Sequence, residues 1–288
     1  MGVARQGRWR WHVLFGLLCL AASSRWILDE GWPATISTLQ SGAWACGVLA
    51  VLVGAMAWRR SLPQPRNAAS LLLVGAGLLA APAVGAVLHG AASASLDRTV
   101  ALCFVPVIVA VVLGIRSDGA GLNLWAGLAG LSGALLVFPV GTPSSARAYI
   151  GLLAPAVMVV FACVECRRAA RGIAKLWSAA LLFAGGAFGL VVLKVVRGGS
   201  ASGVSVSAIA LDALLAGLAV TVALEWDGLL YAARYFAVPL LTIVEGVVLL
   251  HPGLAWRLVA GLVLLAAATV GLLRGQRTAN GTSVLRLR

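Results

Sequence analysis

The sequence predicts an all-α polytopic membrane protein with ten transmembrane helices in two inverted five-helix repeats. Three observations lead to this fold class: an apolar composition, ten apolar runs long enough to cross a bilayer, and a proline motif that occurs once in each half of the chain. Together they indicate that lipid, and not water, is the main solvent of the folded chain.

Composition alone excludes an ordinary soluble domain. Of the 288 residues, 61% are hydrophobic and 11% charged, whereas soluble domains average about 25% charged residues. The apolar runs are continuous and do not alternate with polar residues, so they favour helices over the strands of an outer-membrane barrel. Hydrocarbon offers no hydrogen-bond partner to the backbone N–H and C=O groups, but a helix of about 20 residues pairs these groups within itself.

Ten apolar runs are separated by short linkers that contain turn residues such as Pro63, Pro143 and Pro252. Each run is long enough to span a bilayer. The runs cover residues 11–28, 38–58, 68–89, 99–115, 121–140, 147–164, 176–194, 204–223, 229–250 and 255–273.

Basic residues give this threading an orientation, because Lys and Arg near span ends are retained on the cytoplasmic side. One side receives sixteen of the 22: Arg5, Arg8, Arg10, Arg59, Arg60, Arg66, Arg116, Arg167, Arg168, Arg171, Lys175, Arg234, Arg274, Arg277, Arg286 and Arg288. The other side receives six: Arg25, Arg98, Arg147, Lys194, Arg197 and Arg257. This asymmetry predicts a multi-pass protein of the inner membrane with both termini in the cytoplasm. It also explains the net charge of +13 without a nucleic-acid partner.

The first run has an alternative interpretation as a cleaved signal peptide, because three arginines precede it. Removing it would leave an unpaired set of nine spans, and Leu17 and Leu18 make a poor lipoprotein cleavage site before Cys19. We therefore expect the run to be retained as the first span.

The proline motif relates the fourth and ninth runs. Residues 105–112, Val-Pro-Val-Ile-Val-Ala-Val-Val, match residues 238–245, Val-Pro-Leu-Leu-Thr-Ile-Val-Glu, with Pro106 and Pro239 in register. A glycine-rich final run follows each motif. Because each unit has an odd number of spans, the two copies must have opposite topology, as in many secondary transporters.

These stretches, above all residues 98–139 and 231–273, resemble the drug/metabolite transporter superfamily, in particular transporters with two EamA domains. The resemblance covers nearly the whole chain: a first repeat over 1–141, a second over 142–274, and a basic cytoplasmic tail over 275–288. A Gly-Glu that often follows the penultimate span in that family is replaced by Ile115-Arg116 and His251-Pro252. The resemblance implies alternating-access transport of a small organic solute, outward by default, with protons as one candidate for the coupling ion.

Four ionisable residues lie at membrane depth, where charge is costly and commonly functional. Asp212, Glu245, Lys194 and Arg25 all fall on the outer side of the membrane midplane. We expect Asp212 or Glu245 to bind a cationic group or a proton, and Arg25 or Lys194 to meet a carboxylate. For the two basic residues, snorkelling to the interface is the competing explanation.

The two motif prolines are the other candidates. Each removes a backbone hydrogen bond, so the freed carbonyl is expected to serve as a hinge, as a polar contact for solute, or as a simple packing kink. Glycines such as Gly133 and Gly185 are assigned to helix packing.

No enzyme is predicted. Gly130-Leu131-Ser132-Gly133 matches the G-x-S-G of intramembrane serine proteases, but His12, His89 and His251 all lie at span ends. Cys163 and Cys166 form a C-x-x-C without a second pair, so neither a metal nor another cofactor is expected. The alternative to a transporter is a non-transporting membrane module, such as a flippase accessory or an assembly factor.

Overall fold

The computed structural model describes residues 3–30, 36–63, 65, 68–89, 94–115, 120–138, 146–198, 204–250 and 255–285. Within these ranges every regular element is an α-helix. The helices are α1 (Val3–Glu30), α2 (Ile36–Arg59), α3 (Ala68–Leu79), α4 (Ala81–His89), α5 (Ala94–Gly114), α6 (Ala120–Val137), α7 (Ala146–Ala169), α8 (Lys175–Arg197), α9 (Val206–Glu225), α10 (Gly228–Ala232), α11 (Arg234–Leu250) and α12 (Trp256–Leu285).

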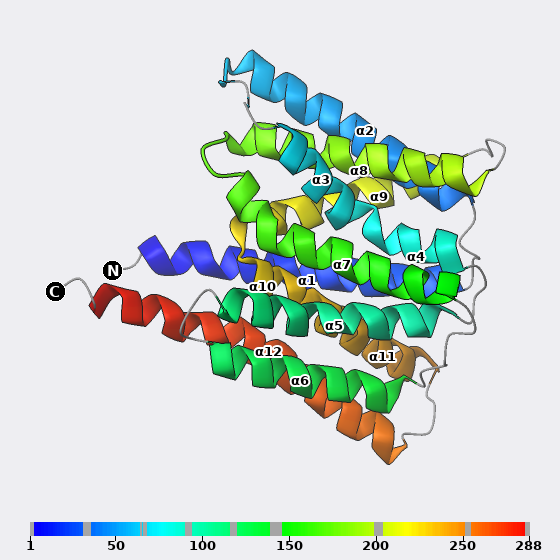
Figure 1. The fold of residues 1–288 in the computed structure, drawn as a ribbon, viewed down its shortest axis with the longest axis vertical. Coiled ribbons are helices and arrows are strands. Elements are labelled where there is room, and N and C mark those ends of the chain that lie inside the picture. The colour runs from blue at the N-terminus through cyan, green and yellow to red at the C-terminus, as the bar shows by residue number, and fades with distance from the viewer. Residues whose placement is uncertain are drawn as a thin grey trace.

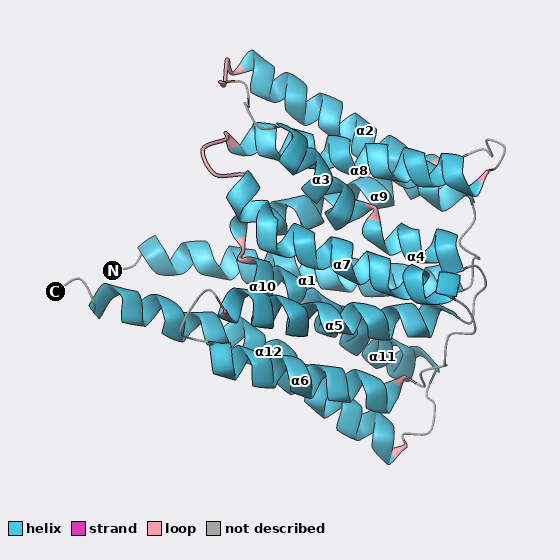
Figure 2. Ribbon diagram, in the orientation of Figure 1, coloured by secondary structure: helices cyan, strands magenta, loops and turns pink. Residues whose placement is uncertain are grey.

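The helices lie side by side and, apart from the consecutive pairs α3–α4 and α10–α11, alternate in direction, so most connections gather at the two ends of the bundle (Figures 1 and 2). The start of α1 and the end of α12 lie at the same end, together with the turns that follow α2 and α7. We call this end the terminal face and the opposite end, where α8 ends and α9 begins, the distal face. α12 continues as a helix to Leu285, through much of the segment expected to be a tail.

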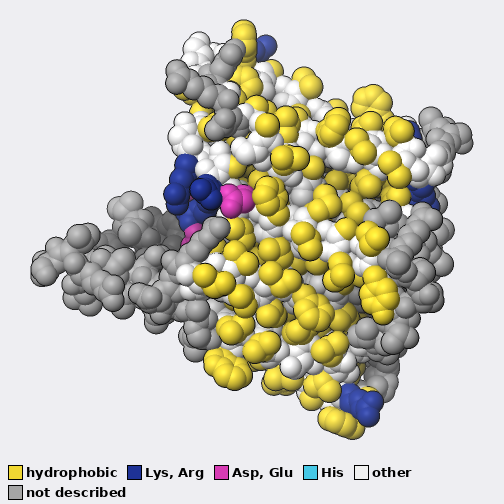
Figure 3. Space-filling model, viewed as in Figure 1, with side chains coloured by type: hydrophobic (Ala, Val, Ile, Leu, Met, Phe, Trp, Pro, Cys, Tyr) yellow, Lys and Arg dark blue, Asp and Glu magenta, His cyan; other side chains and the backbone are white. Residues whose placement is uncertain are grey.

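The surface of the bundle is that of a membrane protein. Among the described residues, six helices are long and apolar enough to cross a bilayer, and three shorter apolar helices accompany them. Large apolar side chains such as Trp125 and Phe188 are more than two-thirds exposed at the bundle surface. Figure 3 shows hydrophobic side chains across the middle of one face, whereas Lys and Arg lie near its edges. Lipid would cover the apolar middle.

Two of the predicted runs are not single helices. The run 68–89 is divided into α3 and α4 at Ala80, and the run 229–250 into α10 and α11 at Ala233. Pro82 accounts for the first break, since its ring displaces the carbonyl four residues earlier and it has no N–H to donate. The second break lies six residues before Pro239, the motif proline.

Glycines allow the closest helix contacts. A Cβ on Gly75 would lie 2.1 Å from the carbonyl oxygen of Leu182, and one on Gly185 would lie 2.0 Å from that of Leu72. α3 and α8 therefore pack backbone against backbone. Gly133 of α6 and Gly261 of α12 approach each other in the same way, with each added Cβ 2.8 Å from the other residue's carbonyl. The packing role expected of Gly133 and Gly185 is confirmed.

Candidate functional site

Asp212 is a buried carboxylate inside a candidate membrane span. It lies six residues after the start of α9, about 9 Å along the helix axis, and is 7% exposed. The Ser41 hydroxyl of α2, itself 1% exposed, donates a 2.6 Å hydrogen bond to Oδ2 of Asp212. A buried carboxylate needs such donors, because burial removes the water that would otherwise solvate it.

Glu245 has a similar arrangement on a different pair of helices. It lies five residues before the end of α11, about 7.5 Å along the axis. The Ser23 hydroxyl of α1, which is fully buried, lies 2.6 Å from Oε1 of Glu245 and 2.9 Å from the carbonyl of Leu20. A serine from the first half of the chain thus contacts a carboxylate from the second half, as at Asp212.

Lys194 has a partner inside the protein. Its Nζ donates to Oε1 of Gln40 at 3.0 Å, and both side chains are partly buried. Snorkelling to the interface is therefore not the whole role of this lysine. The Arg25 side chain lies outside the described residues, and only its place on α1, two residues after Ser23, is given.

The first turns of α2 bring two of the four candidates into one neighbourhood. Gln40 contacts Lys194 while the adjacent Ser41 contacts Asp212. Glu245 is reached separately through α1, which packs against both α9 and α11. Asp212, Lys194 and Glu245 lie toward the distal face, where α8 and α11 end and α9 begins, but no contact joins Glu245 to the other two in the described part of the chain.

The two motif prolines differ in their surroundings. Pro106 is buried within the uninterrupted helix α5. Pro239 leaves the carbonyl of Tyr235 without its usual donor four residues later, and the thiol of Cys103 on α5 donates to that carbonyl at 3.2 Å. The carbonyl is therefore satisfied by the protein itself.

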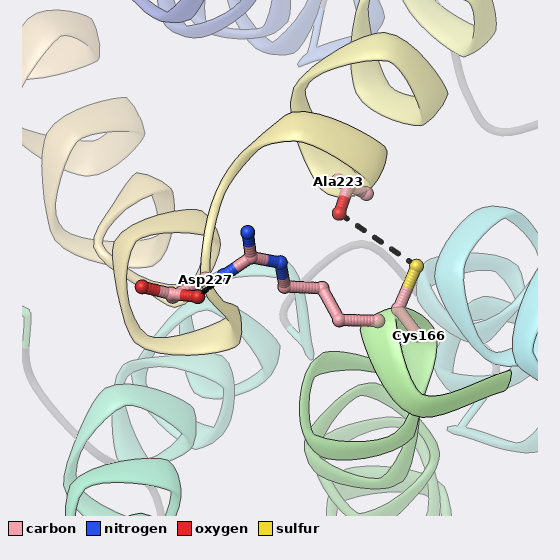
Figure 4. A network of polar contacts seen from close by, with 4 residues as sticks. Cys166, Ala223 and Asp227 are labelled. Carbon is pink, nitrogen blue, oxygen red and sulfur yellow. Dashed lines mark hydrogen bonds and ion pairs between the residues drawn. The ribbon is translucent and has the colours of Figure 1, made fainter. Parts of the chain in front are cut away.

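Ion pairs lie at the terminal face. Arg167 pairs with Asp227, Lys175 with Glu225, and Arg168 with Glu165 at 3.7 Å. Beside the first pair, the Cys166 thiol contacts the carbonyl of Ala223 near the end of α9 at 3.7 Å (Figure 4). The first two pairs connect α7 and α8 to the connection between α9 and α10 and to the end of α9, whereas the third lies within α7.

Arg234 is a residue whose importance the sequence did not reveal. The charge count treats it as a basic residue near a span end, but it lies six residues inside the candidate span Gly228–Leu249. Its guanidinium lies 4.2 Å from the ring centroid of Tyr231 and 4.7 Å from that of Tyr235, whose hydroxyl it also contacts. Aromatic residues three before and one after an arginine in an apolar run are the signal that could have identified it.

The serines that contact the carboxylates were also missed, because Ser23 and Ser41 are common residues in apolar helices and their partners are distant in sequence. No cluster of three potential metal ligands occurs among the described residues. The five cysteines are buried and free.

Comparison with known proteins bears on the fold only. No family model matches the chain, and neither does any curated protein. One solved structure, described as "Crystal structure of protein", is 17% identical and superposes with a TM-score of 0.69 over 92% of this chain and 97% of its own. At that identity, the likeness shows a shared fold.

Proposed function

We propose that the chain is a secondary transporter that moves a small organic solute across the inner membrane by alternating access, with efflux as its direction. The fold in this proposal has ten spans in two inverted five-helix repeats, similar to EamA transporters of the drug/metabolite transporter superfamily. The termini are cytoplasmic, so the terminal face is the cytoplasmic face.

The observation that carries the proposal is the pair of serine–carboxylate contacts at membrane depth. Ser41–Asp212 and Ser23–Glu245, each 2.6 Å long, join helices of the first half to helices of the second. Apolar side chains are sufficient to pack one membrane helix against another, and burying a carboxylate in hydrocarbon costs free energy, so a purely structural interface would not require one. A carboxylate between two moving halves can exchange its serine for a proton or for a cationic group of the solute.

The packing of the helices supports an internal two-fold relation. The proposed repeat pairs α1 with α7, α2 with α8, α3–α4 with α9, α5 with α10–α11, and α6 with α12. Three sets of packed pairs have packed counterparts, whereas among the described residues the contacts of α7 with α10 and of α8 with α9 have none between α1 and α5 or between α2 and α3. α2 packs on α9 and α8 on α3; α1 packs on α11 and α7 on α5; α5 packs on α6 and α11 on α12. The self-related pairs α2–α8 and α6–α12 also pack together.

The test begins with a substrate search. Metabolite levels in medium and cytosol are compared with and without the protein, and each candidate is then tested for uptake into proteoliposomes with imposed pH gradients. We expect at least one small organic solute to accumulate in the medium and to be transported by the purified protein. A proton-coupled exchange would respond to the sign of the gradient.

Variants connect transport to the site. Asp212→Asn and Glu245→Gln keep the shape of each side chain and remove its charge, and at least one is expected to lower the transport rate by tenfold or more. Glu225→Gln is the matched control, because that carboxylate pairs with Lys175 at the terminal face. Unchanged transport in both site variants would remove the proposed site. Absence of transport for every solute would favour the non-transporting module.

A further inference from the structure

Arg234 is a charged side chain held in an aromatic setting inside the bundle. It is the first residue of α11, directly after the break at Ala233. About 10 Å of helix separates it from Asp227, where the chain leaves the terminal face. Its guanidinium covers the face of Tyr231 and lies against Tyr235, and both tyrosines are at least nine-tenths buried.

No described carboxylate neutralises this charge. Five carboxylates have described side chains, and each has another partner: Glu165 with Arg168, Glu225 with Lys175, Asp227 with Arg167, Asp212 with Ser41, and Glu245 with Ser23. Guanidinium has five N–H donors, and among the described residues that of Arg234 makes one side-chain hydrogen bond, to the Tyr235 hydroxyl. Aromatic faces attract a cation but accept little from its remaining donors.

A second polar group beside Arg234 also has a hydrogen-bond donor without a described acceptor. Tyr231 is 1% exposed. Its buried hydroxyl has no hydrogen-bond partner among the described residues. The hydroxyl projects from the ring that Arg234 covers. Buried hydroxyls nearly always find an acceptor, so the described part of the chain places a hydroxyl without an acceptor beside a guanidinium that has one side-chain acceptor for its five N–H groups.

The surroundings of Arg234 belong to the protein core. Cys19 of α1 and Cys163 of α7 are buried, and the thiol of each interacts electrostatically with the Arg234 guanidinium. α10 packs directly on α7, since a Cβ on Gly228 would lie 2.0 Å from the carbonyl oxygen of Cys163. Arg234 itself is partly exposed.

We propose that Arg234 and Tyr231 form an oxyanion subsite that binds a carboxylate or phosphate group between α1, α7 and α10–α11. The guanidinium donates two N–H groups to the anion and the Tyr231 hydroxyl donates a third bond. Resting on the proposed transport function, the inference gives the substrate class as an organic anion, bound at the cytoplasmic side of the distal carboxylates. A lipid headgroup phosphate is the other source of the same chemistry.

The experiment measures the melting temperature of the purified protein in dodecyl maltoside, a detergent without phosphate or carboxylate groups. Sodium phosphate or sodium benzoate is titrated against sodium chloride at constant ionic strength. We expect a saturable rise in melting temperature for the wild type. Arg234→Gln should abolish it, and Tyr231→Phe should weaken the apparent affinity roughly tenfold, the effect of one hydrogen bond to a charged group.

Tyr231→Phe distinguishes a loss of anion binding from a loss of stability, because it should weaken anion binding without lowering the melting temperature of the anion-free protein. Without anion, it should melt at or above the wild-type temperature, since it removes an unsatisfied hydroxyl. Arg257→Gln is the matched control, an exposed arginine 5.7 Å from the ring centroid of Trp256 at the distal face, and should behave as wild type. If soluble anions stabilise the wild type, an equal response in Tyr231→Phe, or a loss of the response in Arg257→Gln, would overturn the proposal.

The ligand source and the transport function are tested apart. If phosphatidylglycerol added to the micelles stabilises the wild type but not Arg234→Gln, while soluble anions have no effect, the subsite stands with lipid as its ligand. If neither soluble anion nor lipid discriminates the two proteins, the subsite is rejected. Because no membrane gradient is involved, preserved anion binding in a protein that transports nothing would reject the transport function alone.

Discussion

The thiol of Cys103 on α5 donates a 3.2 Å hydrogen bond to the backbone carbonyl of Tyr235 on α11. That carbonyl is the one that Pro239 leaves without an intrahelical donor. The two helices carry the two copies of the proline motif, so the motif in the second half is stabilised by a side chain of the first. Cys103 is fully buried. Its thiol supplies the donor that the Tyr235 carbonyl lacks and so connects the two halves of the chain.

Removing this thiol is predicted to destabilise the protein. Cys103→Ala loses the sulfur contacts and leaves a buried carbonyl without a donor, so the free energy of unfolding should fall by about 1–2 kcal/mol. Cys103→Ser keeps a donor and should lose less. The measurement is reversible unfolding in sodium dodecyl sulfate. Cys46→Ala is the control, a buried cysteine for which the described residues provide no acceptor, and an equal loss there would contradict the interpretation.

Pro239→Ala is predicted to make Cys103 dispensable. Alanine restores an N–H that can bond the Tyr235 carbonyl and continue the helix ladder. The loss caused by Cys103→Ala should therefore shrink by about 1 kcal/mol in the Pro239→Ala background, a coupling that a double-mutant cycle measures directly. Additive effects would show that the thiol and the proline act independently.

The sequence predicts the helical fold class because apolar runs of about 20 residues have few other uses. Their periodicity does not reveal where a run is broken, since Ala80 and Ala233 are good helix residues. The first break follows from Pro82. Depth is equally hidden. Arg234 looks like an orientation marker near a span end, yet the chain continues from Asp227 straight into α10 and carries the arginine inside.

The residues that contact the two buried carboxylates could not be predicted from the local sequence pattern. Asp212 and Glu245 stand out as isolated acids in apolar runs, and their position toward the distal face follows from threading alone. Their serines are 171 and 222 residues away in sequence. Only the packing of α2 on α9 and of α1 on α11 selects Ser41 and Ser23 from the other small residues of those helices.

The glycine contacts between α3 and α8 predict a large effect from one methyl group. Gly75→Ala would place its Cβ 2.1 Å from the Leu182 carbonyl oxygen, so the helices must separate, and we expect a loss of roughly 2–3 kcal/mol in unfolding free energy. Gly47→Ala in α2 has no atom within 4 Å of the added Cβ. It should be neutral or stabilising by up to about 1 kcal/mol. Similar losses at both positions would argue against the close α3–α8 contact.

At the terminal face, packing is predicted to outweigh charge. The Arg167 and Asp227 side chains are 52% and 37% exposed, so Arg167→Ala should change the unfolding free energy by less than about 1 kcal/mol. Gly228→Ala, next to Asp227, would put a Cβ 2.0 Å from the Cys163 carbonyl oxygen and should lose about 2 kcal/mol or more. Melting temperatures of the two variants in one detergent decide the order. The reverse order would show that the ion pair holds α10 in place.

Surface labelling of single cysteines tests the threading on which the proposed function depends. The five native cysteines are buried, so an added exposed cysteine should dominate the reaction with a membrane-impermeant maleimide. Ser61 and Arg171 lie in the turns after α2 and α7 at the terminal face, whereas Val206 begins α9 at the distal face. In intact cells Val206→Cys should be labelled, and Ser61→Cys and Arg171→Cys only after lysis. Labelling of Ser61→Cys without Arg171→Cys would break the alternation, because an even number of crossings separates these two turns.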